Sequence, residues 1–264
     1  MNLYSRDFTV PSEKERKALE EYEKWKLEKK ENIFTKADDL RYSHPDENIR
    51  EFLWHFDSLF PNNHLLMPMF DKIDYLAEAD AFKEIIYKAK NEQEIQRYIK
   101  SERKWHIPGS IFLDYNFGHH DAYLFPEQSL GDRYAADYLL VGFNSDGCNL
   151  VFVEFEKANT EFILTTSNME SESVRKGLTQ IRDWRNWMDD HRITFIKDMG
   201  LLSKGFDVPT TRIFYCLVVS RRDFMSDEAK TIRSQMVSND AHLKIISFDR
   251  LADNLSKLVH GTTW

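Results

Sequence analysis

RYAADYLLVGFNSDGCNLVFVEFEK, at residues 133–157, consists of two apolar runs around a polar turn. The runs cover residues 135–143 and 150–155, and the sequence N-S-D-G stands between them. Runs of this length, rich in Val, Leu, Phe and Tyr and separated by turn residues, predict two antiparallel strands joined by a hairpin. We expect this hairpin to form the core of a sheet around which the rest of the chain is arranged.

Three acidic residues, Asp137, Glu154 and Glu156, lie in this apolar segment. A carboxylate in such surroundings is costly unless it is paired or binds a cation. Glu154 and Glu156 are two residues apart, so they point to the same face of a strand, and strand pairing can bring Asp137 beside them. Three carboxylates on one face repel one another, and a bound Mg²⁺ or Mn²⁺ relieves that repulsion.

Composition narrows the class of protein. The 264 residues suffice for one large domain, or for a domain with an appendage. The net charge of −8 argues against a polybasic protein that coats nucleic acid, but it permits a nuclease whose metal site is acidic. Cys148 and Cys216 belong to no C-x-x-C pair, so we expect no zinc site and a reducing cytoplasm. Without a run of eighteen apolar residues, we expect a cytoplasmic protein that does not enter a membrane.

A polar and aromatic helix is predicted after the hairpin. Ser167 and Glu170 form a capping pattern, and the helix is expected to end near Asp190. Gln180 lies at the edge of its apolar stripe, followed by Trp184 and Trp187. An uncharged amide there can hydrogen-bond a phosphate, a metal-bound water or a carboxylate. Positive charge on the same helix suits a phosphate backbone, and it comes from Arg175, Lys176, Arg182 and Arg185. An ordinary amphipathic helix with tryptophans in the core is the alternative.

Hydrophobic periodicity assigns the rest of the chain. Helices are predicted at residues 12–31, 49–56, 79–90, 91–107, 226–236 and 249–259, and strands at 211–220 and 243–248. Residues 111–125 are expected to be extended, and 32–46 and 192–210 to be loops. His119 and His120 are adjacent, so on a strand they point to opposite faces and cannot easily bind one ion.

Asp137, followed seventeen residues later by E-x-E, resembles the core of the PD-(D/E)xK nuclease superfamily. In that superfamily the Asp and the first Glu hold a divalent metal, and a third residue, usually Lys, positions or activates water. Its members often carry an acid on a helix before the first strand, for which Glu92 and Glu94 are candidates. A capping or solvated role is the alternative for each.

The closer resemblance is to the Shedu-type nuclease domain of bacterial anti-phage defence, over roughly residues 91–259. It rests on NEQEIQRYIKSERKWHIPG, AADYLLVGF, VFVEFEKA and VRKGLTQIRDWRNWM. The resemblance implies an α/β (α+β) fold with a restriction-endonuclease-like mixed central sheet flanked by helices. We therefore expect a nuclease domain at residues 81–264 and a helical N-terminal appendage at 1–80. Self-association into a homo-oligomer is implied by resemblance only.

The resemblance also assigns roles to residues. Asp137 and Glu154, with the carbonyl of Phe155, would hold Mg²⁺ or Mn²⁺, and Gln180 would be the polar residue of the helix near the site. Arg175, Lys176 and Arg182 would contact nucleic acid. The family core usually shows a Lys two residues after the first Glu, but here Glu156 takes that place and Lys157 follows it. A strand bulge would bring Lys157 in; otherwise Glu156 acts as the third residue.

Two functions follow from these patterns. The first is a metal-dependent nuclease that hydrolyses the phosphodiester bonds of DNA in anti-phage defence, with RNA as an open alternative. The second is a catalytically silent module of the same fold that binds nucleic acid or a phage protein as a sensor. The absence of Lys at position 156 and the acidic net charge favour the second.

Overall fold

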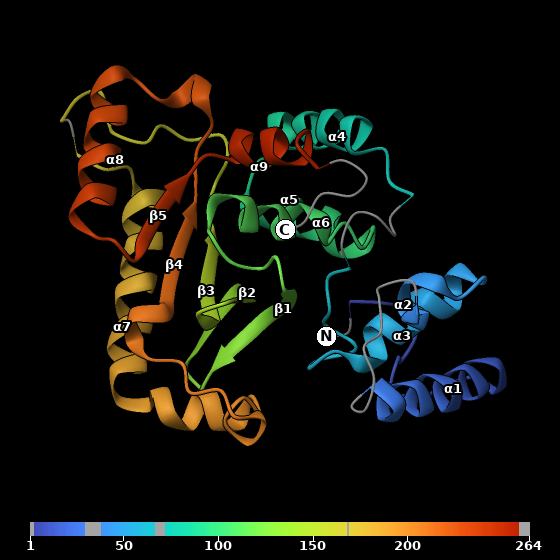
Figure 1. The fold of residues 1–264 in the computed structure, drawn as a ribbon. Helices are drawn as coiled ribbons and strands as arrows, with labels where there is room; N and C mark the ends of the chain where they lie inside the picture. Colours follow the sequence, from blue (N-terminus) through green and yellow to red (C-terminus); the bar gives the residue numbers. More distant parts are fainter. Residues whose placement is uncertain (1–2, 30–37, 67–71, 168, 259–264) are drawn as a thin grey trace.

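A five-stranded mixed sheet forms the centre of the protein (Figure 1). The computed structural model describes residues 3–29, 38–66, 72–167 and 169–258. The strands follow the order β1-β2-β3-β4-β5, with β1–β3 antiparallel and β3–β5 parallel. Their bounds are β1 Asp121–Leu130, β2 Tyr134–Asn144, β3 Gly147–Phe155, β4 Ile213–Val218 and β5 Leu243–Ile246. The predicted α+β fold with a mixed sheet flanked by helices is confirmed.

The predicted hairpin is formed by β2 and β3. Its ladder begins at the pair Asn144–Gly147, so the turn is shorter than the polar cluster suggested. Gly147 has a φ of +118°, which L-residues with side chains rarely adopt. The expected extended stretch at 111–125 is partly wrong. Ser110–Asp114 forms the 3₁₀ helix η3, and β1 begins only at Asp121.

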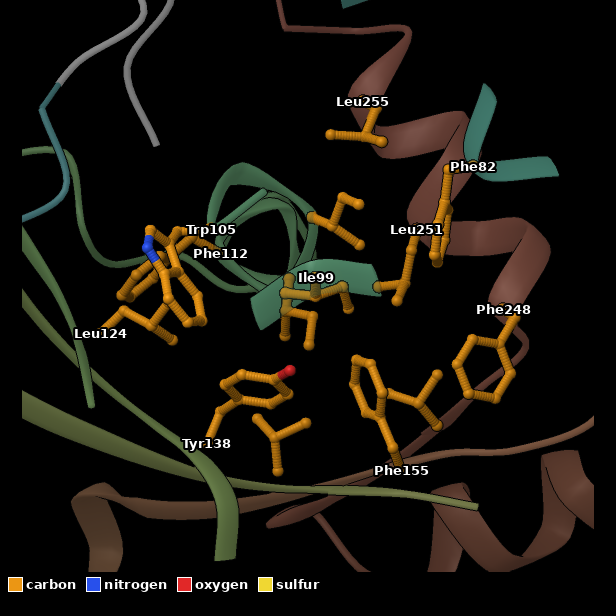
Figure 2. Packing of buried hydrophobic residues seen from close by; sticks show 14 of the residues in the cluster. Phe82, Ile99, Trp105, Phe112, Leu124, Tyr138, Phe155, Phe248, Leu251 and Leu255 are labelled. Carbon is orange, nitrogen blue, oxygen red and sulfur yellow. The ribbon is translucent and has the colours of Figure 1, made fainter. Parts of the chain in front are cut away.

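One face of the sheet is covered by four helices, which Figure 1 shows on the opposite side from α7 and α8. They are α4 Tyr75–Lys88, α5 Glu92–Ser101, α6 His106–Gly109 and α9 Phe248–Leu255. Tyr138 and Phe155 of the hairpin pack in one core with Ile99, Phe112 and Phe248 (Figure 2). This apolar burial fixes α5 beside the hairpin.

The other face is covered by α7 Glu172–Asp198 and α8 Asp227–Asn239. The helix α7 begins at the cap residue Ser171, so the predicted cap at Ser167 and Glu170 is wrong. It also continues beyond Asp190, through part of the predicted loop at 192–210. The reason is that Phe195 and Ile196 are buried and extend the apolar stripe of the helix. Short 3₁₀ helices follow in the connections: η4 Leu202–Lys204, η5 Thr210–Arg212 and η6 Arg222–Phe224.

Three N-terminal helices form a small apolar cluster of their own, around Phe8, Phe52 and Leu53. They are α1 Glu13–Lys29, α2 Leu40–Ser43 and α3 Glu47–Asp57. The predicted capping box of α1 is present, because Ser12 N–H donates to Glu15 Oε2 at 2.8 Å and Glu15 N–H donates to Ser12 Oγ at 3.4 Å. Part of the predicted loop at 32–46 lies outside the described residues, and the division of domains at residue 80 stays a prediction.

Candidate active site

The two central strands separate at the acidic end of the hairpin. The last pair of the β2–β3 ladder is Tyr138 with Val153, and Asp137 and Glu154 occupy the next positions. There, Asp137 Oδ2 accepts the N–H of Phe155 at 2.7 Å. The Asp137 carboxylate thus accepts the hydrogen bond that a backbone carbonyl of β2 would accept in a continued ladder. Without it, the N–H of Phe155 at the end of β3 would be buried without a partner. This side-chain bond holds Asp137 beside Glu154.

Two helices line the acidic end of the hairpin. Gln96 of α5 lies near Asp137 and Gln180 of α7 lies near Glu154, and each amide lowers the pKa of the carboxylate beside it. Lys176 Nζ, also on α7, lies 2.9 Å from Glu156 Oε1 and 3.7 Å from Glu92 Oε1. The site therefore draws residues from β2, β3, α5 and α7.

Burial and mutual repulsion make these acids weak. Glu154 is only 4% exposed, and its pKa is raised to about 9 by burial and then by the charges of Asp137 and Glu156. Burial also raises the pKa of Asp137, although the Phe155 N–H and Gln96 lower it. In the same way, burial raises the pKa of Glu156, although Lys176 lowers it. At neutral pH such a site holds a proton or another cation.

Gly177 allows α7 to approach the strands closely. A Cβ at this position would lie 2.4 Å from Leu217 Cδ1 and 3.2 Å from Glu156 Cγ. Lys176 precedes this glycine, and Gln180 follows it by one turn, on the part of α7 that contacts the acids. The missing side chain therefore sets the distance at which both residues reach β3.

The family of the chain follows from a comparison with family models. The model described as Shedu protein SduA, C-terminal, matches residues 43–252. The chain belongs to this Shedu family. The match contains the whole acidic site, and it confirms the resemblance seen in the sequence. No curated protein matches the chain. None of the described helices is long and apolar enough to cross a membrane.

In this Shedu chain, the structure separates the predicted basic residues into two groups. Lys176 contacts the acidic site, whereas the Lys157 side chain is exposed and its carbonyl accepts the N–H of Ser220 at 2.9 Å. Arg175 and Arg182 are exposed and seven residues apart, so they share a solvent-facing side of α7. The cation in contact with Glu156 therefore comes from a helix and not from the strand end.

The helix before the first strand contributes more than one residue to the site of this Shedu chain. Glu92 approaches Lys176, whereas Glu94 serves as a cap, because its Oε2 accepts the N–H of Lys90 at 3.0 Å. Sequence reasoning missed Gln96 and Lys100. The signal was present in the spacing, since Glu92, Gln96 and Lys100 are each one helical turn apart on α5.

The donor atoms fit a hard divalent cation. Asp137, Glu154 and the carbonyl of Phe155 are oxygen donors of the kind that Mg²⁺ and Mn²⁺ bind. The buried Gln180 Oε1 and Glu92 Oε2 have no hydrogen-bond partner within the described ranges. In the same part of the chain, no three His, Cys, Asp or Glu side chains are grouped so as to hold a metal ion. Main-chain or amide oxygens would therefore have to complete the ligands.

Proposed function

We propose that the protein is a divalent-metal-dependent nuclease of the PD-(D/E)xK type that hydrolyses DNA. Membership of the Shedu family supports a role in anti-phage defence. The observation that carries the proposal is the placement of the half-buried Asp137 beside the buried Glu154, each with a glutamine from a flanking helix near it. A buried carboxylate whose pKa is raised by neighbouring carboxylates, as that of Glu154 is, is typical of sites that bind cations or transfer protons.

Each residue of the site has a role in this proposal. Asp137, Glu154 and the carbonyl of Phe155 would hold Mg²⁺ or Mn²⁺, which when bound polarises the phosphodiester and lowers the pKa of water. Gln180 and Gln96 orient the two carboxylates through their amide groups. Lys176, next to Glu156, provides a positive charge for the phosphate. Arg175 and Arg182 would contact the backbone of the nucleic acid further out.

Cleavage assays test this proposal directly. Linear, circular and single-stranded DNA, and RNA, would be incubated with the protein in Mg²⁺, Mn²⁺ or EDTA. We expect metal-dependent cutting of DNA by the wild type and its loss in Asp137→Asn, with the far-UV circular dichroism unchanged. Asp132→Asn, at an exposed position between β1 and β2, is the matched control. Full activity of a folded Asp137→Asn protein would reject the assigned site.

The identity of the third residue gives a separate prediction. Lys176→Met should reduce cleavage by roughly a hundredfold, within the range typical of a positioned catalytic side chain. Lys176→Arg should retain part of the activity, because it keeps the charge. Lys197→Met changes an exposed lysine in the last turn of the same helix and is the control. A larger loss in Lys157→Met than in Lys176→Met would assign the role to the strand end instead.

A silent binding module is the second candidate function. It is favoured by the contact between Glu156 and Lys176, which places an ion pair at the position where the family usually has a lysine. Salt-sensitive DNA binding without cleavage in either metal would support it. Efficient cleavage of DNA would reject this second function.

A further inference from the structure

Glu127 has an unusual backbone conformation within β1. Its φ of +53° lies in the left-handed region, which costs a residue with a side chain free energy. The β1–β2 ladder is interrupted at this point, between the pairs Pro126–Tyr138 and Gln128–Ala136. The register therefore places Glu127 across from Asp137, the first carboxylate of the candidate active site. Strain at such a place suggests a local functional constraint.

The register therefore sets two carboxylates across from each other. Like charges directly opposite each other on neighbouring strands destabilise a sheet. Glu127 instead contacts α5, where its Oε1 lies 2.5 Å from Lys100 Nζ. The Lys100 side chain is 22% exposed and that of Glu127 is 55% exposed, so the acid lies on the solvent side of the pair.

Lys100 is also linked to the acidic site. It follows Gln96, which lies near Asp137, by one turn of α5, and the charge of Lys100 lowers the pKa of Asp137. Lys104, one turn later, differs in its surroundings. Its Nζ lies 2.6 Å from Glu78, which is 19% exposed and which His106 Nε2 also contacts at 3.2 Å. Lys104 thus belongs to a partly buried network, whereas an exposed acid pairs with Lys100. An exposed acid pairs weakly because water competes for it.

We propose that Lys100 binds a phosphate of the nucleic acid next to the scissile bond, and that Glu127 is the group this phosphate displaces. This inference rests on the proposed function for its substrate. In the free protein, Glu127 neutralises Lys100 and keeps its ammonium at the edge of the site. On binding, a phosphate oxygen takes the place of the Glu127 carboxylate. Lys100 and Lys176 then approach the substrate from α5 and α7.

The test is a double-mutant cycle on DNA affinity, measured by fluorescence anisotropy with a labelled duplex in EDTA over a series of salt concentrations. Lys100→Met should weaken binding roughly tenfold at low salt, as expected for a charged hydrogen bond, and reduce the salt slope by about 0.9. Glu127→Gln should tighten binding severalfold. In the Lys100→Met background, Glu127→Gln should change little, because its partner is gone. Lys100→Arg should restore most of the affinity.

Lys104→Met is the matched control, because it breaks an ion pair on the neighbouring turn without removing a proposed phosphate contact. A purely structural pair would shift affinity in the same direction in both single variants and lower both melting temperatures. That result would overturn the inference. It would also be overturned if Glu127→Gln tightened DNA binding as much in the Lys100→Met background as in the wild type, or if the wild type did not bind DNA. Because the binding assay needs no cleavage, DNA binding of this pattern without cutting would reject the nuclease, and with it the scissile bond, but would retain the exchange of Glu127 for a phosphate at Lys100.

Discussion

Glu154→Gln is expected to abolish most DNA cleavage and to stabilise the metal-free protein at alkaline pH. The loss of activity should be at least about a hundredfold, since residues that only orient a metal ligand already contribute about ten- to a hundredfold. The amide of Gln fits the same space and cannot ionise. The variant thus separates the charge of Glu154 from the packing of this residue, which is only 4% exposed.

The direction of the pH effect follows from the raised pKa. Glu154 titrates near 9 in the folded protein and near 4.5 when unfolded, so the folded state holds an extra proton between these values. Its stabilisation is complete below about pH 4.5, and the free energy of unfolding falls as pH rises to about 9, by up to about 1.4 kcal/mol per pH unit. Glu154→Gln should flatten this slope, leaving only the part due to Asp137 and Glu156.

Urea unfolding in EDTA from pH 5 to pH 9 measures this difference. The wild type should lose on the order of several kcal/mol over this range, and Mg²⁺ should restore part of it, because a bound cation replaces the proton. Glu161→Gln alters an exposed acid after β3 and should keep the slope of the wild type. A wild-type stability that does not change with pH would show that Glu154 is already compensated by another charge.

Gly177→Val is expected to lower the free energy of unfolding by about 2 kcal/mol, as overpacking of a core typically does. The first added carbon alone would lie 2.4 Å from Leu217 Cδ1, and Leu217 is fully buried. A substitution of glycine within a helix would otherwise be favourable, so the clash has to outweigh that gain. Leu217 is fully buried in β4 and has little room to shift, so we expect α7 to move away from the sheet, which withdraws Lys176 and Gln180 from the acids.

The same variant should lose about a hundredfold in cleavage, because small displacements of positioned groups are costly. Urea midpoints and initial cleavage rates measure the two effects. Thr179→Val places the same side chain on the exposed side of α7 and is the control for helix propensity. If Gly177→Val were as stable and active as Thr179→Val, the close approach of α7 would have no functional importance.

The sequence by itself determined the hairpin and the positions of its acids. Strand alternation and turn residues are signals that extend over only a few neighbouring residues. The sequence could therefore predict β2 and β3, together with the two-residue spacing of Glu154 and Glu156. The Shedu resemblance was readable for the same reason, because it is carried by four short segments. The helix end predicted near Asp190 was wrong, because packing of Phe195 and Ile196 in the core extends α7 to Asp198.

Only the tertiary structure decided which groups meet the acids. Lys157 follows Glu156 in the sequence, yet Lys176, twenty residues away, is the lysine in contact with it. The reason is that Gly177 lets α7 pack closely on Leu217 of β4 and on Glu156 after β3, a contact between distant segments that no local spacing encodes. In the same way, the pairing of β1 with β2 and the position of α5 bring Glu127, Lys100 and Gln96 to Asp137. Sheet register and helix packing thus determine which charges act on Asp137.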